Sequence, residues 1–163
     1  HPDDLGRALD LLAAVPSYRP SVTAWARAAF DVLDGTQDGS ATLGVPTWHY
    51  GHEPPNVFAT AIAKYFRNSI REATLLQVCD AGIVFLPGLA GTVQEVFQDA
   101  CENYYAAPEA VAPMILVGEQ HWQHELPVWE LMQRLAAGRP MQEHLYCVDS
   151  VEQAVQVLAA RAS

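Results

Sequence analysis

The chain has 163 residues, half of them apolar, which is enough to bury one full-sized core, so a single domain over residues 1–163 is expected. Its formal net charge of −10, with only 9 Lys and Arg, argues against a nucleic-acid partner but permits one small anionic ligand in a locally positive pocket. Cys79, Cys101 and Cys147 lie far apart without disulfide or metal spacing, which favours reduced thiols in a cytoplasmic protein. The sequence shows no long apolar span or signal-type leader, so no membrane partner is expected.

The first part of the chain predicts helices over 5–14, 21–33 and 56–78 and a short strand over 41–45. Asp3 or Asp4 can cap the first helix, and Ser21 or Thr23 can cap the second. The chain starts at His1 without Met and goes straight into a helical pattern. We therefore expect it to be the C-terminal portion of a longer protein.

From residue 82 onward, strand patterns alternate with helix patterns. The expected strands cover 82–86, 113–118 and 145–148, and the expected helices cover 91–106, 124–137 and 150–161. The strands are short and uniformly apolar, which is typical of a parallel sheet with helices on both faces. Asp149 and Ser150 are expected to cap the last helix. We therefore predict an α/β fold with a doubly wound, Rossmann-like parallel sheet, whose ligand lies at the carboxyl ends of the strands.

A glycine-rich turn joins the first of these strands to its helix. Four apolar residues, 83–86, run into the turn, and a helix pattern follows at once. A buried strand, a turn and a helix N-terminus in this order form an anion site, because the turn amides point outward and the helix dipole favours a phosphate. Thr92 can cap the helix or bind the phosphate, and no Gly-Lys-Ser/Thr follows that would indicate ATP with Mg²⁺. The predicted phosphate-binding residues are Gly88, Leu89, Ala90, Gly91 and Thr92.

Arg71 and Glu95 are the candidate catalytic pair. Right-handed strand–helix–strand packing places their helices over the same sheet. The carboxylate of Glu95 can hydrogen-bond ribose hydroxyls or act as a general base on water, and Arg71 can hold a phosphate or polarise a leaving group. In the alternative interpretation, Arg71 and Glu72 are surface charges and Glu95 stabilises the start of its helix. The sequence leaves both open.

Residues after the strand over 41–45 can line the same cleft, and Glu53, Asn56 and His49 are the candidates for a pocket wall. The alternative for Asn56 is the N-cap of the helix over 56–78. Aromatic residues beside His49 can stack on a nucleobase, although such clusters are more often packing. No metal-ligand spacing emerges, and His121, His124 and His144 are expected to be exposed polar residues.

The run Pro87–Glu95 resembles the Pro-Gly-Gly-x-Gly-Thr-x-x-Glu signature of the LOG ("lonely guy") family, formerly labelled lysine decarboxylases. An Arg nine residues before an Asp-Ala pair belongs to the same pattern, and here Arg71 precedes Asp80-Ala81. The similarity covers roughly 40–160 and fits the larger, nucleotide 5′-monophosphate nucleosidase branch best. Leu89 stands where the family has its second Gly. The family's earlier strand and Gly-rich loop have no counterpart here, so they lie upstream or are missing.

The resemblance implies a hydrolase that cleaves the N-glycosidic bond of a nucleoside 5′-monophosphate into free base and ribose 5-phosphate. It carries the catalytic roles to Arg71 and Glu95, requires no metal or other cofactor, and implies a homodimer. A non-catalytic carrier of a nucleotide or of molybdenum cofactor is the alternative, and a regulatory or structural subunit is a third. Retention of Arg71 and Glu95 favours the enzyme, whereas Leu89 favours the carrier.

Overall fold

The computed structural model describes residues 2–36, 39–48 and 54–161. The chain packs into two compact units, His1–Arg71 and Glu72–Ser163, each with its own internal contacts. The single domain expected over 1–163 stays a prediction. Within the described ranges, no helix is both long and apolar enough to cross a membrane.

The first unit begins with two helices, α1 (Pro2–Ala13) and α2 (Val22–Asp34), close to their predicted ranges. The predicted cap of α2 is confirmed, because Ser21 Oγ accepts a hydrogen bond from the Ala24 amide at 3.2 Å. The predicted cap of α1 is wrong. Since α1 already includes Pro2, Asp3 and Asp4 lie inside its first turn.

Two very short strands follow, β1 (Leu43–Gly44) and β2 (Ala61–Ile62), and they pair in parallel. The helix predicted over 56–78 is therefore wrong in its first half. Thr60 explains the difference, because its hydroxyl donates to the Thr42 carbonyl and accepts from the Thr42 amide, at 3.0 and 2.9 Å. These bonds hold the segment extended beside β1. The helix that does form, α3 (Asn68–Val78), runs through the boundary between the units.

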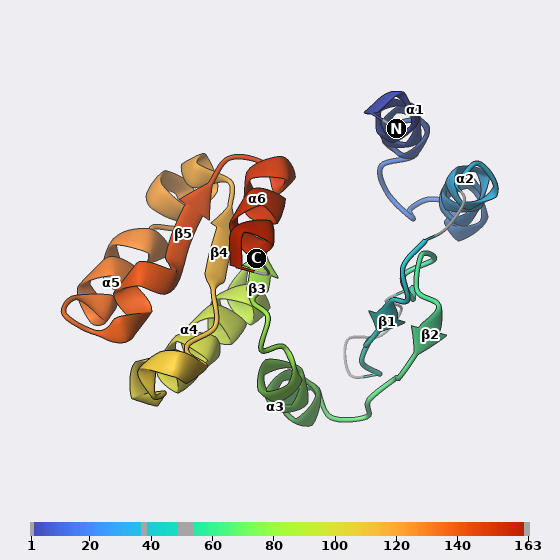
Figure 1. Cartoon of the computed structure of the whole chain (residues 1–163). Helices are drawn as coiled ribbons and strands as arrows, with labels where there is room; N and C mark the ends of the chain where they lie inside the picture. Colours follow the sequence, from blue (N-terminus) through green and yellow to red (C-terminus); the bar gives the residue numbers. More distant parts are fainter. Residues whose placement is uncertain (1, 37–38, 49–53, 162–163) are drawn as a thin grey trace. The chain divides into compact units, whose positions relative to one another are not determined.

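The second unit contains a three-stranded parallel sheet in the order β3 (Ile83–Phe85), β4 (Met114–Val117) and β5 (Leu145–Val148). The helices are α4 (Ala90–Tyr105), α5 (Val128–Ala136) and α6 (Val151–Arg161). Figure 1 shows the three strands side by side, with α6 on one face of the sheet and α4 and α5 on the other. The molecule is therefore a mixed α/β protein with two small parallel sheets.

Alternate residues of β4 supply the two halves of the core of this unit. Met114 and Leu116 pack with α4 and α5 around the buried Trp122, whereas Ile115 and Val117 pack with α6. All four β4 residues are buried, which explains why the sequence of this strand is uniformly apolar. The predicted cap of α6 is confirmed by the hydrogen bond from the Gln153 amide to Ser150 Oγ, at 3.3 Å.

The helix predicted over 124–137 begins later than expected. A π-helical turn at His121–Glu125 comes first, and α5 starts at Val128. Pro127 separates them, since it has no amide hydrogen and disfavours a helical conformation in the residue before it. Leu126 is accordingly non-helical, with φ −133° and ψ 82°.

Candidate functional site

The glycine-rich turn connects the carboxyl end of β3 to the first turn of α4. The N-cap position is occupied by Leu89, which provides no side-chain hydrogen bond to the helix and is 78% exposed. Its φ of −109° is accessible to any residue, so the turn forms without a second glycine at this position. An exposed helix start of this kind, without a side-chain cap, is suited to an anion.

One of the two roles predicted for Thr92 was to cap this helix, and that prediction is wrong. The helix has begun by Ala90, so Thr92 lies within its first turn. Its side chain packs against Gly88 instead: a Cβ on Gly88 would clash with Thr92 Oγ1 and lie 2.7 Å from the Thr92 Cβ. Gly88 is therefore required for the turn to close over Thr92.

Two glycine substitutions are expected to separate this packing from helix propensity. Gly88→Ala is expected to displace the turn and therefore, at the phosphate site predicted from the sequence, to weaken binding of ribose 5-phosphate at least tenfold. Gly91→Ala is the comparison for stability: apart from its chain neighbours and the backbone of its own helix, the added Cβ meets no atom within 4 Å, so the free energy of unfolding is expected to rise by about 0.5–1 kcal/mol. Calorimetric titration and urea unfolding measure both effects. Equal phosphate binding by Gly88→Ala and the native chain would contradict the expectation.

His121 contacts this turn from the neighbouring strand. It follows the carboxyl end of β4, and its Nε2 lies 3.0 Å from the carbonyl oxygen of Gly88. Its Nδ1 lies 3.2 Å from Glu125 Oε2. The prediction that His121 is an exposed polar residue is wrong, because only 16% of its side chain is exposed and both ring nitrogens have partners.

Gly118 allows the loop after β4 to approach the glycine-rich turn after β3. It directly follows β4 and has φ +96°, a conformation that side chains disfavour, and a Cβ there would lie 3.2 Å from Pro87 Cγ. Pro87 therefore sits directly against the backbone of the next loop. The carboxyl ends of β3 and β4 form one packed edge that carries the turn.

Glu95 is half-buried in the second turn of α4 and lines a cavity of about 280 Å³ with Glu72 of α3. Glu72 is only 2% exposed and accepts a 2.7 Å hydrogen bond from Gln94 Nε2, so the interpretation of Glu72 as a surface charge is wrong. The rest of the cavity wall is largely apolar and comes from α3, β3 and the segment that joins them. The turn residues do not line this cavity.

Asp99 lies one helical turn beyond Glu95 on α4 and is 4% exposed. Its Oδ2 has no hydrogen-bond partner within the described part of the chain. Burial, and secondarily the charge of Glu102, raise the pKa of Asp99 from 3.8 to about 7. The sequence pattern gave no indication of this group.

Arg71 is the last residue of the first unit, whereas Glu95 belongs to the second. The guanidinium Nη1 of Arg71 donates to the Val45 carbonyl at 3.5 Å, within the first unit. The pairing of Arg71 with Glu95 therefore stays a prediction.

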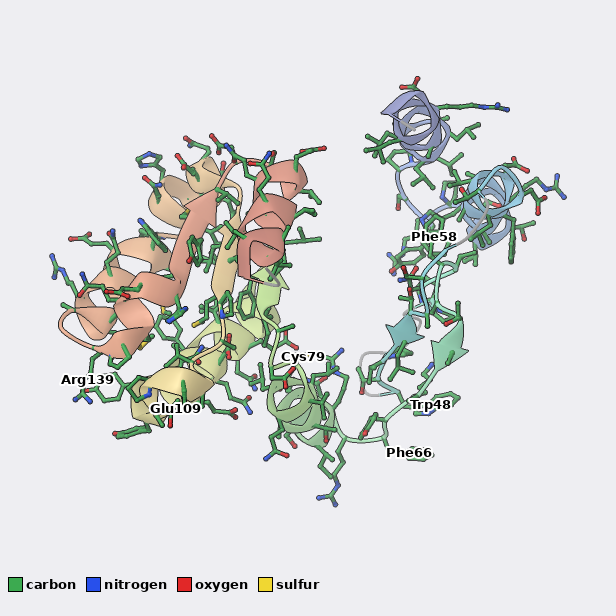
Figure 2. All side chains as sticks on the ribbon, in the orientation of Figure 1. Trp48, Phe58, Phe66, Cys79, Glu109 and Arg139 are labelled. Atoms are coloured by element: carbon green, nitrogen blue, oxygen red, sulfur yellow. The ribbon has the colours of Figure 1, made fainter. Side chains whose placement is uncertain are left out.

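Of the predicted pocket-wall residues, His49 and Glu53 lie outside the described residues. Asn56 is exposed and does not cap a long helix; its Oδ1 accepts from the Phe58 amide at 3.0 Å, in a local turn. Trp48 stacks on Phe66, with ring centroids 6.1 Å apart (Figure 2). Lys64 Nζ lies 3.9 Å from the centroid of the Trp48 ring. Packing thus accounts for part of the aromatic cluster.

Within the described ranges, His, Cys, Asp and Glu side chains do not form a group of three or more that could hold a metal ion. Comparisons with protein-family models and with curated proteins give no match to this sequence. The candidate site therefore rests on its own chemistry: an exposed helix start, a glycine-dependent turn, and a histidine that contacts the turn carbonyl.

Proposed function

We propose that this protein is a phosphoribohydrolase that cleaves the N-glycosidic bond of a nucleoside 5′-monophosphate, on a doubly wound, Rossmann-like sheet. The observation that carries the proposal is the turn between β3 and α4. It offers the exposed N-terminus of a helix that extends from Ala90 to Tyr105, at the carboxyl edge of parallel strands. Ligand phosphates bind at this position in open α/β sheets.

The phosphate supplies binding energy remote from the bond that breaks. Amides of the turn hold the 5′-phosphate, which fixes the ribose relative to the catalytic groups. The carbon–nitrogen bond then lengthens, and the sugar carbon takes on oxocarbenium character that a carboxylate stabilises. We assign this role to Glu95, which also orients the attacking water. Water supplies the hydroxyl of ribose 5-phosphate, and the base leaves with the bonding electron pair and a proton. Arg71 polarises the leaving group or holds the phosphate.

Two further features support this proposal. Leu89 accommodates the helix N-cap at an unstrained φ, so its presence is compatible with a working phosphate turn. Glu95 is half-buried beside largely apolar wall residues, where the charge of a carboxylate acts more strongly than in water. We further propose that the enzyme is a homodimer, as its resemblance to the LOG family implies, and that it is cytoplasmic, as its three cysteines without disulfide spacing favour.

The test incubates the purified protein with AMP, GMP, CMP, UMP or IMP and measures the release of free base by chromatography. The expected result is equimolar free base and ribose 5-phosphate from at least one nucleotide. Release of inorganic phosphate without free base would contradict the proposal. Nucleotide binding without any turnover would also contradict it and would favour the non-catalytic carrier.

A further inference from the structure

We propose that His121 is a positioning residue for the phosphate turn: it holds the Gly88 carbonyl inward, so that the next amide faces the ligand. The inference rests on the proposed function and adds to the site a residue that follows a different strand, β4. It is carried by the two contacts of the imidazole ring.

The first contact sets the orientation of the turn. A carbonyl oxygen only accepts hydrogen bonds, so His121 Nε2 carries a hydrogen and donates it to Gly88. A trans peptide is planar, with its C=O and N–H pointing in opposite directions. Holding the Gly88 carbonyl toward His121 therefore points the Leu89 amide away from it. Leu89 is the exposed N-cap of α4, so this amide is added to the donors at the helix start.

The second contact holds the ring from its other side. Glu125 Oε2 lies 3.2 Å from Nδ1, and Glu125 is four residues further along the same π-helical turn. The two contacts together fix the orientation of the imidazole ring relative to the Gly88 peptide.

The His121 ring also contacts a buried residue of the core. His121 makes an edge contact with the Trp122 ring, with centroids 4.7 Å apart. Trp122 is fully buried, and its indole N–H donates to the Val117 carbonyl at 2.9 Å. The residue that positions the turn is thus anchored in the core.

The experiment measures dissociation constants of ribose 5-phosphate by calorimetric titration, and KM and kcat for the best nucleotide. His121→Phe keeps an aromatic ring beside Trp122 but removes both ring nitrogens, including the one that contacts Gly88. We expect it to weaken ribose 5-phosphate binding by about tenfold, the value of one charge-assisted hydrogen bond, and to raise KM more than it lowers kcat. His121→Asn, whose amide is too short to reach Gly88, is expected to behave in the same way and covers the case in which Phe disturbs folding.

His121→Gln is the rescue variant, because its longer amide can donate to the Gly88 carbonyl; binding is expected within threefold of the native value. His124→Gln, at an exposed histidine of the same helical turn, is the matched control and is expected to have no effect. A native dissociation constant in folded His121→Phe or His121→Asn would overturn the inference while leaving the proposed function intact. Absence of ribose 5-phosphate binding by the native protein would instead overturn the proposed phosphate site, and the role of His121 with it.

Discussion

Glu95→Gln is expected to lower the rate of free-base release by about 10²–10⁴-fold, the usual effect of removing a general acid–base group. The amide has the size of the carboxylate, but it carries no negative charge to stabilise the sugar cation and cannot take a proton from water. Because the proposed phosphate contacts lie at the start of α4, binding of ribose 5-phosphate is expected to stay within about threefold of the native value. Steady-state kinetics and calorimetric titration measure the two effects.

Glu102→Gln is the matched control for this experiment. It removes the same charge from the same helix, at an exposed position two turns further along. The rate of free-base release is expected to be unchanged. Native turnover in folded Glu95→Gln would remove Glu95 from the mechanism.

Asp99→Asn is expected to stabilise the protein near neutral pH. Asp99 is buried, and its pKa in the folded chain is about 7 against a usual value of 3.8. Between these pH values the folded chain binds a proton that the unfolded chain releases. The contribution of Asp99 to the free energy of unfolding therefore falls as the pH rises from about 4 to about 7, and it is constant above that. The total loss is at most about 4 kcal/mol.

An asparagine at position 99 has no charge to bury, so this loss disappears. The difference in the free energy of unfolding between Asp99→Asn and the native chain is expected to be small at pH 4 and largest above pH 7. Urea unfolding at pH 4, 5, 6, 7 and 8 measures it. In Glu102→Gln, the decrease in the free energy of unfolding between pH 4 and pH 7 is expected to become only slightly smaller. Burial, and not the charge of Glu102, is the larger cause of the raised pKa of Asp99. A difference that stays constant from pH 4 to pH 8 would contradict the expected titration of Asp99.

The sequence predicted the second unit well because its signals are local. Each strand there is a continuous apolar run, and β5 has the predicted ends. The helices α4 and α6 begin within a residue of the expected positions, the latter with a Ser150 cap that needs only neighbouring atoms. The exception is the delayed start of α5, and Pro127 would have indicated it.

The helix predicted over 56–78 failed for the opposite reason. Its apolar spacing resembles that of a helix, but Ala61–Ile62 pair with a strand about eighteen residues earlier in the chain. The hydroxyl of Thr60 reinforces that pairing. Local propensity carries no information about such a distant partner, so tertiary pairing prevailed.

The candidate site was predicted only in part. The turn and Glu95 belong to one contiguous pattern, whereas His121 comes from the next strand and has no motif of its own. A signal was nevertheless present: Gly118 and His121 follow the carboxyl end of a strand adjacent to the glycine turn, where parallel strands bring their loops together. Asp99 was missed because a polar residue inside a helix pattern is usually exposed.

The spatial order of β3, β4 and β5 is also their order along the chain. Within this sheet, each new strand is added at an edge, and none has to be inserted between two strands that are already paired. The strands can therefore pair in the order in which they are synthesised, and no pairing already made has to open to admit a later strand. Since both halves of the core are built on β4, the sheet becomes stable only once β4 has joined β3.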